Sequence, residues 1–197
     1  MFNLFLSLIL ALYYVPICSA HPLEAREVGT TPFNLYAYGT NINGLRVFYA
    51  DGEAQLGDMS LSSATNKIAI SVTYGTKKNT WIARPQTSTG NALFKSGDGS
   101  SNSTLLGLSS GTAIANPVTF PLYDEASGSE ISPAGDLTAV WSLYGTYVIL
   151  TETGANFYAK PTGKDGWYIL LWSRSVSASV DYIPITLTIN APSAGNT

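Results

Sequence analysis

Two segments of this 197-residue sequence alternate apolar and polar side chains with a period of two. In KIAISVTY, at 67–74, Ile68, Ile70 and Val72 point to one side of an extended chain, and the residues between them point to the other. In YIPITLTI, at 182–189, the four isoleucine and leucine side chains likewise lie opposite the two threonines. Antiparallel sheets with one buried face and one wet face show this pattern. The sequence is therefore predicted to form antiparallel strands.

Short runs rich in β-branched and aromatic residues recur between clusters of Gly, Pro, Asn and Ser, whereas helical signals are nearly absent after the first 20 residues. The predicted strands are Phe33–Tyr38, Leu45–Ala50, Ala54–Leu56, Lys67–Tyr74, Thr80–Arg84, Asn91–Lys95, Pro117–Leu122, Leu137–Leu143, Tyr147–Thr151, Asn156–Lys160, Gly166–Ser173 and Ile183–Ile189. The Gly- and Ser-rich stretch Ser96–Asn116 is predicted to be a surface loop. The pattern predicts an all-β fold: a single-domain antiparallel β-sandwich, jelly-roll-like, with a β-barrel as the alternative.

Residues 1–20 have the features of a secretory signal peptide. An apolar run over 5–15 is followed by the small-residue cleavage site Cys18-Ser19-Ala20. The run is too short to span a membrane, which takes about 20 apolar residues. We therefore expect a secreted, extracellular protein without a membrane partner.

The N-terminal region also holds the only cysteine, Cys18, and the only histidine, His21. Cleavage after Ala20 removes the thiol, which excludes disulfides and zinc–thiolate sites from the mature chain. It leaves His21 at the terminus, as in copper-dependent oxygenases, but a copper brace needs a second histidine. A further cut after Arg26 would remove 21–26 as a pro-segment and leave 27–197 as one β domain. We expect no cofactor and no metal site.

The charge and the missing side chains narrow the function classes. The formal net charge is −3 and only 12% of residues are charged, so there is no basic footprint for nucleic acid. Without His and Cys, hydrolysis would have to use two carboxylates. Asp51, Glu53 and Asp58 lie together in YADGEAQLGD, and Glu152 lies further along. Because Asp51-Gly52 is a hairpin-turn signature, we favour a turn role for Asp51 over a catalytic one.

Two segments carry a resemblance to other proteins. LYAYGTNINGLRVFYADGEAQLGD, at 35–58, and NFYAKPTGKDGWYILLW, at 156–172, pair an aromatic-Ala-Asp-Gly hairpin with an FYA…GWY-aliphatic-W hairpin. Together they resemble a group of small secreted proteins of filamentous fungi. The resemblance implies an extracellular β protein, and it includes no catalytic motif and transfers no functional residue.

Aromatic residues are the most suggestive candidates for ligand binding. Sugar rings stack their C–H faces on exposed aromatic planes, while Asn, Asp and backbone groups bind the hydroxyls. Core packing is the usual role of a strand Trp, but the candidate ligand-binding residues are Trp167 with Tyr158, Trp81 in a similar hairpin, and Asp51. Asn102 begins the only N-x-S/T sequon, which predicts N-glycosylation.

Three functional hypotheses follow. The leading one is a secreted, non-enzymatic β-sandwich that acts at the cell wall or another extracellular surface and binds glycan. The first alternative is a carboxylate-dependent glycosidase or lyase. The second is a secreted effector that binds a host protein, which a large exposed apolar patch without a groove would favour.

Overall fold

The computed structural model describes residues 31–87, 103–111, 113–124, 129–130, 136–175 and 181–193. The predicted signal peptide and pro-segment, the strand predicted at Asn91–Lys95 and the sequon at Asn102 lie outside these residues. Within them the structure has no helix long and apolar enough for a membrane crossing.

The described residues form antiparallel β-strands and one short 3-10 helix, Met59–Leu61. The strands are β1 (Tyr36–Gly39), β2 (Ile42–Ala50), β3 (Glu53–Gly57), β4 (Lys67–Tyr74), β5 (Trp81–Pro85), β6 (Thr104–Leu105), β7 (Gly107–Leu108), β8 (Asn116–Thr119), β9 (Tyr123–Asp124), β10 (Ser129–Glu130), β11 (Trp141–Tyr144), β12 (Tyr147–Leu150), β13 (Asn156–Pro161), β14 (Trp167–Ser173) and β15 (Ile183–Thr188). The prediction of an all-β, antiparallel fold is confirmed.

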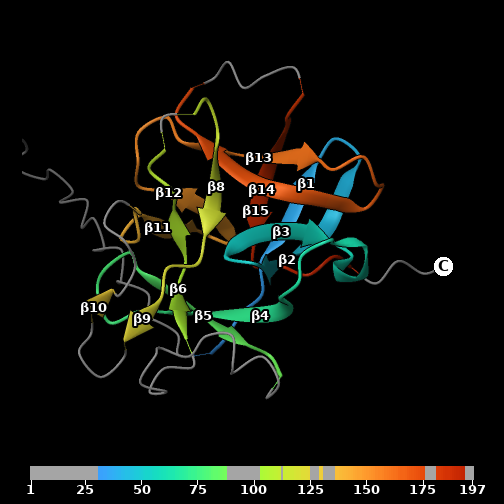
Figure 1. Cartoon of the computed structure of the whole chain (residues 1–197). Helices are drawn as coiled ribbons and strands as arrows, with labels where there is room; N and C mark the ends of the chain where they lie inside the picture. The colour runs from blue at the N-terminus through green and yellow to red at the C-terminus, as the bar shows by residue number, and fades with distance from the viewer. Residues whose placement is uncertain are drawn as a thin grey trace, which may run out of the picture.

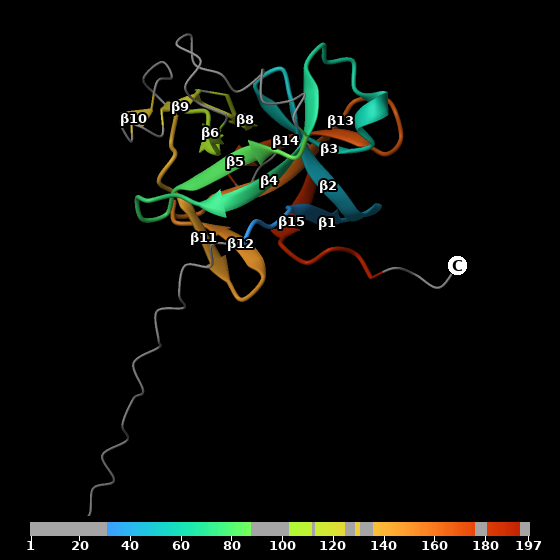
Figure 2. The same cartoon turned by 90° about the horizontal axis from the view of Figure 1, so that it is seen from below.

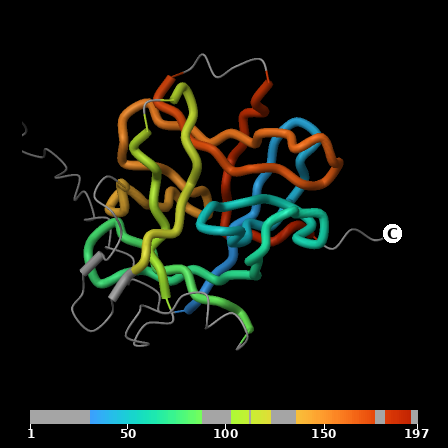
Figure 3. The backbone as a smooth tube through the Cα atoms, in the orientation of Figure 1, coloured from blue at the N-terminus to red at the C-terminus, as the bar shows by residue number. Residues whose placement is uncertain are grey.

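The strands form two facing layers. β13, β14 and β3 lie in one layer, and β15, β1 and β2 lie behind it (Figure 1). Hydrogen bonds join the layers at both edges, because β3 pairs with β2 as well as β14, and β15 pairs with β13 as well as β1. β1 and β15 come from opposite ends of the chain and lie side by side (Figure 3). The result is a sandwich whose layers share a ring of hydrogen-bonded strands.

Two hairpins extend the sheet beyond this ring. The β4–β5 hairpin attaches to β2, and the β11–β12 hairpin attaches to β15 through the pair Tyr147 and Thr188. The backbone N–H of Trp141 donates to the carbonyl of Asn79 at 2.9 Å, which brings β11 against the loop between β4 and β5. The two hairpins therefore meet along one side of the molecule (Figure 2).

A stack of aromatic rings fills the core between these hairpins. The Trp81 and Trp141 ring centroids are 5.3 Å apart at 23°, and those of Trp141 and Phe157 are 5.9 Å apart at 13°. Phe33 and Tyr74 both pack edge-on against Trp81. Aromatic pairs of this kind contribute about 0.5–1.5 kcal/mol each beyond the area they bury. The stack holds together β5, β11 and β13, which are far apart in sequence.

The structure corrects the predicted surface loop Ser96–Asn116 in its second half. β6 and β7 lie in this stretch, and Leu106 and Leu108 are buried. The backbone N–H of Leu106 donates to the carbonyl of Trp81 at 2.9 Å. The Gly and Ser content obscured the apolar run LLGL, whose leucines complete the core.

The pairing of β3 with β14 makes a sharp prediction about two glycines. Gly57 (φ 103°) and Gly52 (φ 94°) have similar left-handed backbones, but a Cβ on Gly57 would collide with the carbonyl oxygen of Gly166, whereas one on Gly52 meets open space. We expect Gly52→Ala to lower the free energy of unfolding by about 1–2 kcal/mol through its positive φ alone. Gly57→Ala should cost roughly 1–3 kcal/mol more because of the clash. Urea unfolding of both variants measures the difference, and equal losses would contradict the close β3–β14 approach.

Candidate functional site

The three aromatic residues named from sequence are in the interior. Trp167 is 7% exposed, Tyr158 4% and Trp81 1%. The indole Nε1 of Trp167 donates to Gln55 Oε1 at 2.8 Å, and the Tyr158 hydroxyl donates to the carbonyl of Ser175 at 3.3 Å. Their ring faces are covered by protein because their strands direct them into the packed layers. The exposed rings of the molecule lie elsewhere.

Asp51 holds a turn, as its sequence context predicts. Asp51 (φ 46°) and Gly52 (φ 94°) join β2 to β3, with Ala50 paired to Glu53. Two left-handed residues in a two-residue hairpin define the type I′ turn that Asp-Gly favours. Both carboxylate oxygens accept backbone N–H groups at 2.8 Å, from Thr65 and Asn66. Asp51 therefore ties the hairpin to the chain that enters β4.

The other acids considered for two-carboxylate chemistry also have local structural roles. Glu152 accepts a hydrogen bond from Arg174 at 2.6 Å, and Asp58 accepts one from the backbone N–H of Ser60 at 2.8 Å. Among the described residues, no three His, Cys, Asp or Glu side chains gather in a way that could hold a metal ion. The described contacts of Asp51, Glu152 and Asp58 are therefore those of structural residues rather than of a reactive pair of carboxylates.

Among the described residues, the most exposed aromatic side chains lie on the outer side of the β11–β12 hairpin. Tyr144 is 76% exposed, Tyr147 55% and Ile149 43%. Tyr144 lies directly across from Tyr147, and Ser142 lies across from Ile149. Paired residues in antiparallel strands point to the same face, so these four side chains share one side, while Trp141 and Val148 on the other side are buried. Among the described residues, only one further large hydrophobic side chain, Ile114, is comparably exposed.

The neighbouring strands continue this aromatic surface. Tyr147 is paired with Thr188 on β15, and Thr188 is paired on its other edge with Tyr36 on β1. Two residues along, Thr186 is paired with Tyr38. Leu187 of β15 is buried and Thr186 is exposed, so the half-buried Tyr36 and Tyr38 lie on the same side of the sheet as Tyr144 and Tyr147, with the buried Thr188 between Tyr36 and Tyr147. We refer to these four tyrosine side chains as the tyrosine face.

Polar groups fix one end of the tyrosine face. Arg46 is paired with Tyr36 across β1 and β2. Its Nη2 donates to Asn34 Oδ1 at 2.8 Å and to the carbonyl of Ile70 at 3.0 Å. The amide of Asn34 donates to the Tyr36 hydroxyl at 3.4 Å, and Gln86 Nε2 donates to Asn34 Oδ1 at 2.8 Å. This network holds Tyr36 in place and supplies hydrogen-bonding groups beside its ring.

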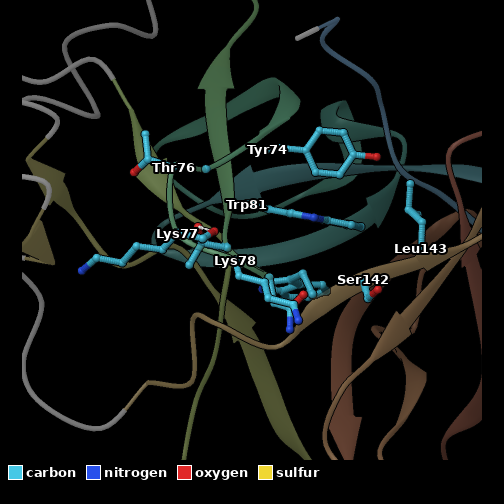
Figure 4. A pocket seen from close by; sticks show the side chains of 11 residues that line it. Tyr74, Thr76, Lys77, Lys78, Trp81, Ser142 and Leu143 are labelled. Carbon is cyan, nitrogen blue, oxygen red and sulfur yellow. Dashed lines mark hydrogen bonds between the residues drawn. The ribbon is translucent and has the colours of Figure 1, made fainter. Parts of the chain in front are cut away.

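A pocket of about 380 Å³ adjoins the tyrosine face at β11. Its walls come from the β4–β5 loop on one side and from β11 on the other, with the Trp81 ring between them (Figure 4). Lys77, Lys78 and Asn79 line the loop side, and Ser142 and Leu143 line the strand side. Ser142 belongs both to this pocket and to the outer side of the hairpin. Leu143 and Trp141, which also line the pocket, point to the opposite side of β11, so the pocket and the tyrosine face meet at this end strand of the sheet and together form the candidate site.

No protein-family model, curated protein or solved structure matches this chain. The candidate site therefore rests on its own geometry.

Sequence reasoning did not single out the tyrosine face or the lysine loop. The signal was present in WSLYGTYVIL, at 141–150, where Gly-Thr separates two alternating runs. Read as a two-residue hairpin, it places Tyr144 opposite Tyr147 and puts the large Trp141 on the other side. The lysines of GTKKNT, at 75–80, could be placed beside this hairpin only from the fold.

The hydrogen bonds to Asp51 make a prediction about acid stability. The backbone N–H groups of Asn66 and then Thr65 lower the pKa of this carboxyl below its ordinary 3.8. A lowered folded-state pKa stabilises the fold fully above pH 3.8, and the contribution is lost as the pH falls through the folded-state value. Asp51→Asn keeps a residue that tolerates a left-handed turn but removes the charge.

We therefore expect Asp51→Asn to be less stable than the wild type at pH 5, and the two stabilities to converge as the pH approaches 2. Urea unfolding at intervals across this range measures the difference. Parallel stability curves for the two proteins would show that the carboxylate does not hold the turn.

Proposed function

We propose that this chain is a secreted, non-enzymatic β-sandwich that binds polysaccharide at a cell wall or another extracellular surface through the tyrosine face. The observation that supports this most directly is the pair Tyr144 and Tyr147, which lie opposite each other on one hairpin with most of their surface in water. Exposed large apolar side chains gathered on one surface mark interaction sites. The signal peptide expected from residues 1–20 supports the extracellular location.

The chemistry of the face suits a sugar chain. The C–H face of a pyranose ring packs on an aromatic plane, and a tyrosine supplies such a plane together with a hydroxyl. A tyrosine side chain also loses little conformational entropy on binding because it has two side-chain torsions. The exposed Thr186 and the Arg46–Asn34 pair lie beside the rings and can bond sugar hydroxyls. Rings spread over β11, β12 and β1 favour an extended ligand over a single small molecule.

The adjoining pocket favours a glycan over a protein partner. A flat apolar patch without a groove would favour contact with a host protein, but here Ser142 links the exposed rings to a pocket. The enzyme alternative receives less support because Asp51 and Glu152 are bound to a turn backbone and to Arg174. Binding without catalysis is the function that the geometry supports best.

Retention on insoluble polysaccharide tests this proposal. The wild-type protein should sediment with at least one of chitin, β-1,3-glucan, cellulose or pectin. Tyr144→Ala combined with Tyr147→Ala should weaken that binding roughly tenfold or more, since each lost ring contact contributes about 0.5–1.5 kcal/mol beyond its area. Both side chains are exposed, so the variant should unfold at a denaturant concentration close to that of the wild type.

Ile114→Ala is the matched control, because Ile114 is an exposed apolar residue that lies outside the tyrosine face. It should bind as the wild type does. The proposal is wrong if the wild type is retained on none of the polysaccharides, or if the double tyrosine variant and the Ile114 variant bind equally well. Light scattering of the unbound protein shows whether the face instead joins two copies of the chain.

A further inference from the structure

The pocket beside the tyrosine face is lined by positively charged side chains, although the chain as a whole is acidic. Lys77 and Lys78 are adjacent and exposed, and the described residues that line the pocket include no Asp or Glu. Neither lysine is ion-paired with a carboxylate of the described residues. Because the whole chain carries a formal net charge of −3, this loop is a local positive site on an acidic protein.

The loop that carries the lysines is held by hydrogen bonds at both ends. The backbone N–H of Gly75 donates to the carbonyl of Thr80 at 2.8 Å, and the Thr80 hydroxyl donates to the carbonyl of Lys77 at 2.6 Å. Asn79 adopts a left-handed conformation (φ 60°), and its carbonyl accepts from Trp141 N–H. The lysine backbones are therefore fixed relative to β11, which lowers the ordering cost of a bound ligand.

The pocket lies within reach of the exposed rings. Ser142 in the pocket and Tyr144 on the face are two residues apart on β11, so their Cα atoms are separated by about 6.6 Å. The half-buried Leu143 gives the strand side of the pocket an apolar contact surface, whereas the Trp81 ring is covered by its aromatic neighbours. The pocket volume of about 380 Å³ falls within the range of small-molecule sites. A chain bound across Tyr144 and Tyr147 can thus place a neighbouring unit between the lysine loop and β11.

We propose that the ligand of this site is an anionic glycan, with the acidic group of one sugar unit bound by Lys77 and Lys78. This inference rests on the proposed function and specifies its substrate class. The tyrosine face supplies stacking for any sugar chain, while the lysine loop selects chains that carry a carboxylate or a sulfate. Because exposed ion pairs are screened by salt, binding should weaken as the ionic strength rises.

Polygalacturonate and its highly methyl-esterified form make the sharpest pair of probes, because they share a backbone and differ in charge. Calorimetric titration of the full chain should show tighter binding to the unesterified polymer. Lys77→Gln combined with Lys78→Gln should weaken that binding about fivefold and leave binding to the esterified polymer unchanged. A sulfated glucan in a third arm distinguishes sulfate from carboxylate, since the probe with the larger lysine-dependent loss identifies the preferred group.

Lys160→Gln combined with Lys164→Gln is the control, because it changes the net charge equally on residues outside the pocket. The control should bind as the wild type does. The inference is overturned if charged and esterified polymers bind equally, or if the two lysine variants weaken binding by the same factor. Binding to a neutral polysaccharide that depends on Tyr144 and Tyr147 but not on the lysines would reject the inference and keep the proposed function. Loss of all glycan binding in the wild type would reject both.

Discussion

The stack of Trp81, Trp141 and Phe157 is the interaction on which the rest of this structure depends. It joins a strand from each of two outer hairpins to β13 in the central ring, over sequence separations that no local signal bridges. Trp141 adds a hydrogen bond from its indole Nε1 to the carbonyl of Leu106 at 2.6 Å, which fixes the short strands β6 and β7 to the same core. Because Trp141 faces inward on β11, the alternation of the strand turns Ser142 and Tyr144 outward. The packing of the core thus determines which aromatic rings remain in water.

The same alternation explains what could be predicted from sequence. The period-two pattern in KIAISVTY matches β4 residue for residue, and Asp51-Gly52 forms the hairpin turn that its chemistry favours. The pairing of β1 with β15 and of β3 with β14 could not be predicted. A two-residue alternation shows that a strand has two different faces, but it does not show which strand pairs with it. For the same reason, the sequence did not decide whether Trp167 and Trp81 are buried or exposed. An aromatic residue on a strand fits a core and a binding surface equally well until the partner strands are known.

The candidate site combines two features that are remote in sequence. Tyr36 and Tyr38 come from the first strand, Tyr144 and Tyr147 from a late hairpin, and the lysines from the loop between β4 and β5. β15 brings the tyrosines together because it is hydrogen-bonded to β1 on one side and to β12 on the other. The bond from Trp141 N–H to the Asn79 carbonyl brings in the lysine loop. The site thus follows from the closure of the fold rather than from any short motif.

The proposed site requires ligand to bind on the outer side of the β11–β12 hairpin. NMR spectra of the protein with 13C-labelled tyrosine rings, recorded during titration with oligogalacturonate, test it most directly. If ligand binds on this hairpin, the ring signals of Tyr144 and Tyr147 should shift in proportion to the ligand bound. The signals of the buried Tyr158 should stay in place. Saturable binding that shifts Tyr158 and leaves Tyr144 and Tyr147 unchanged would place the ligand elsewhere on the protein.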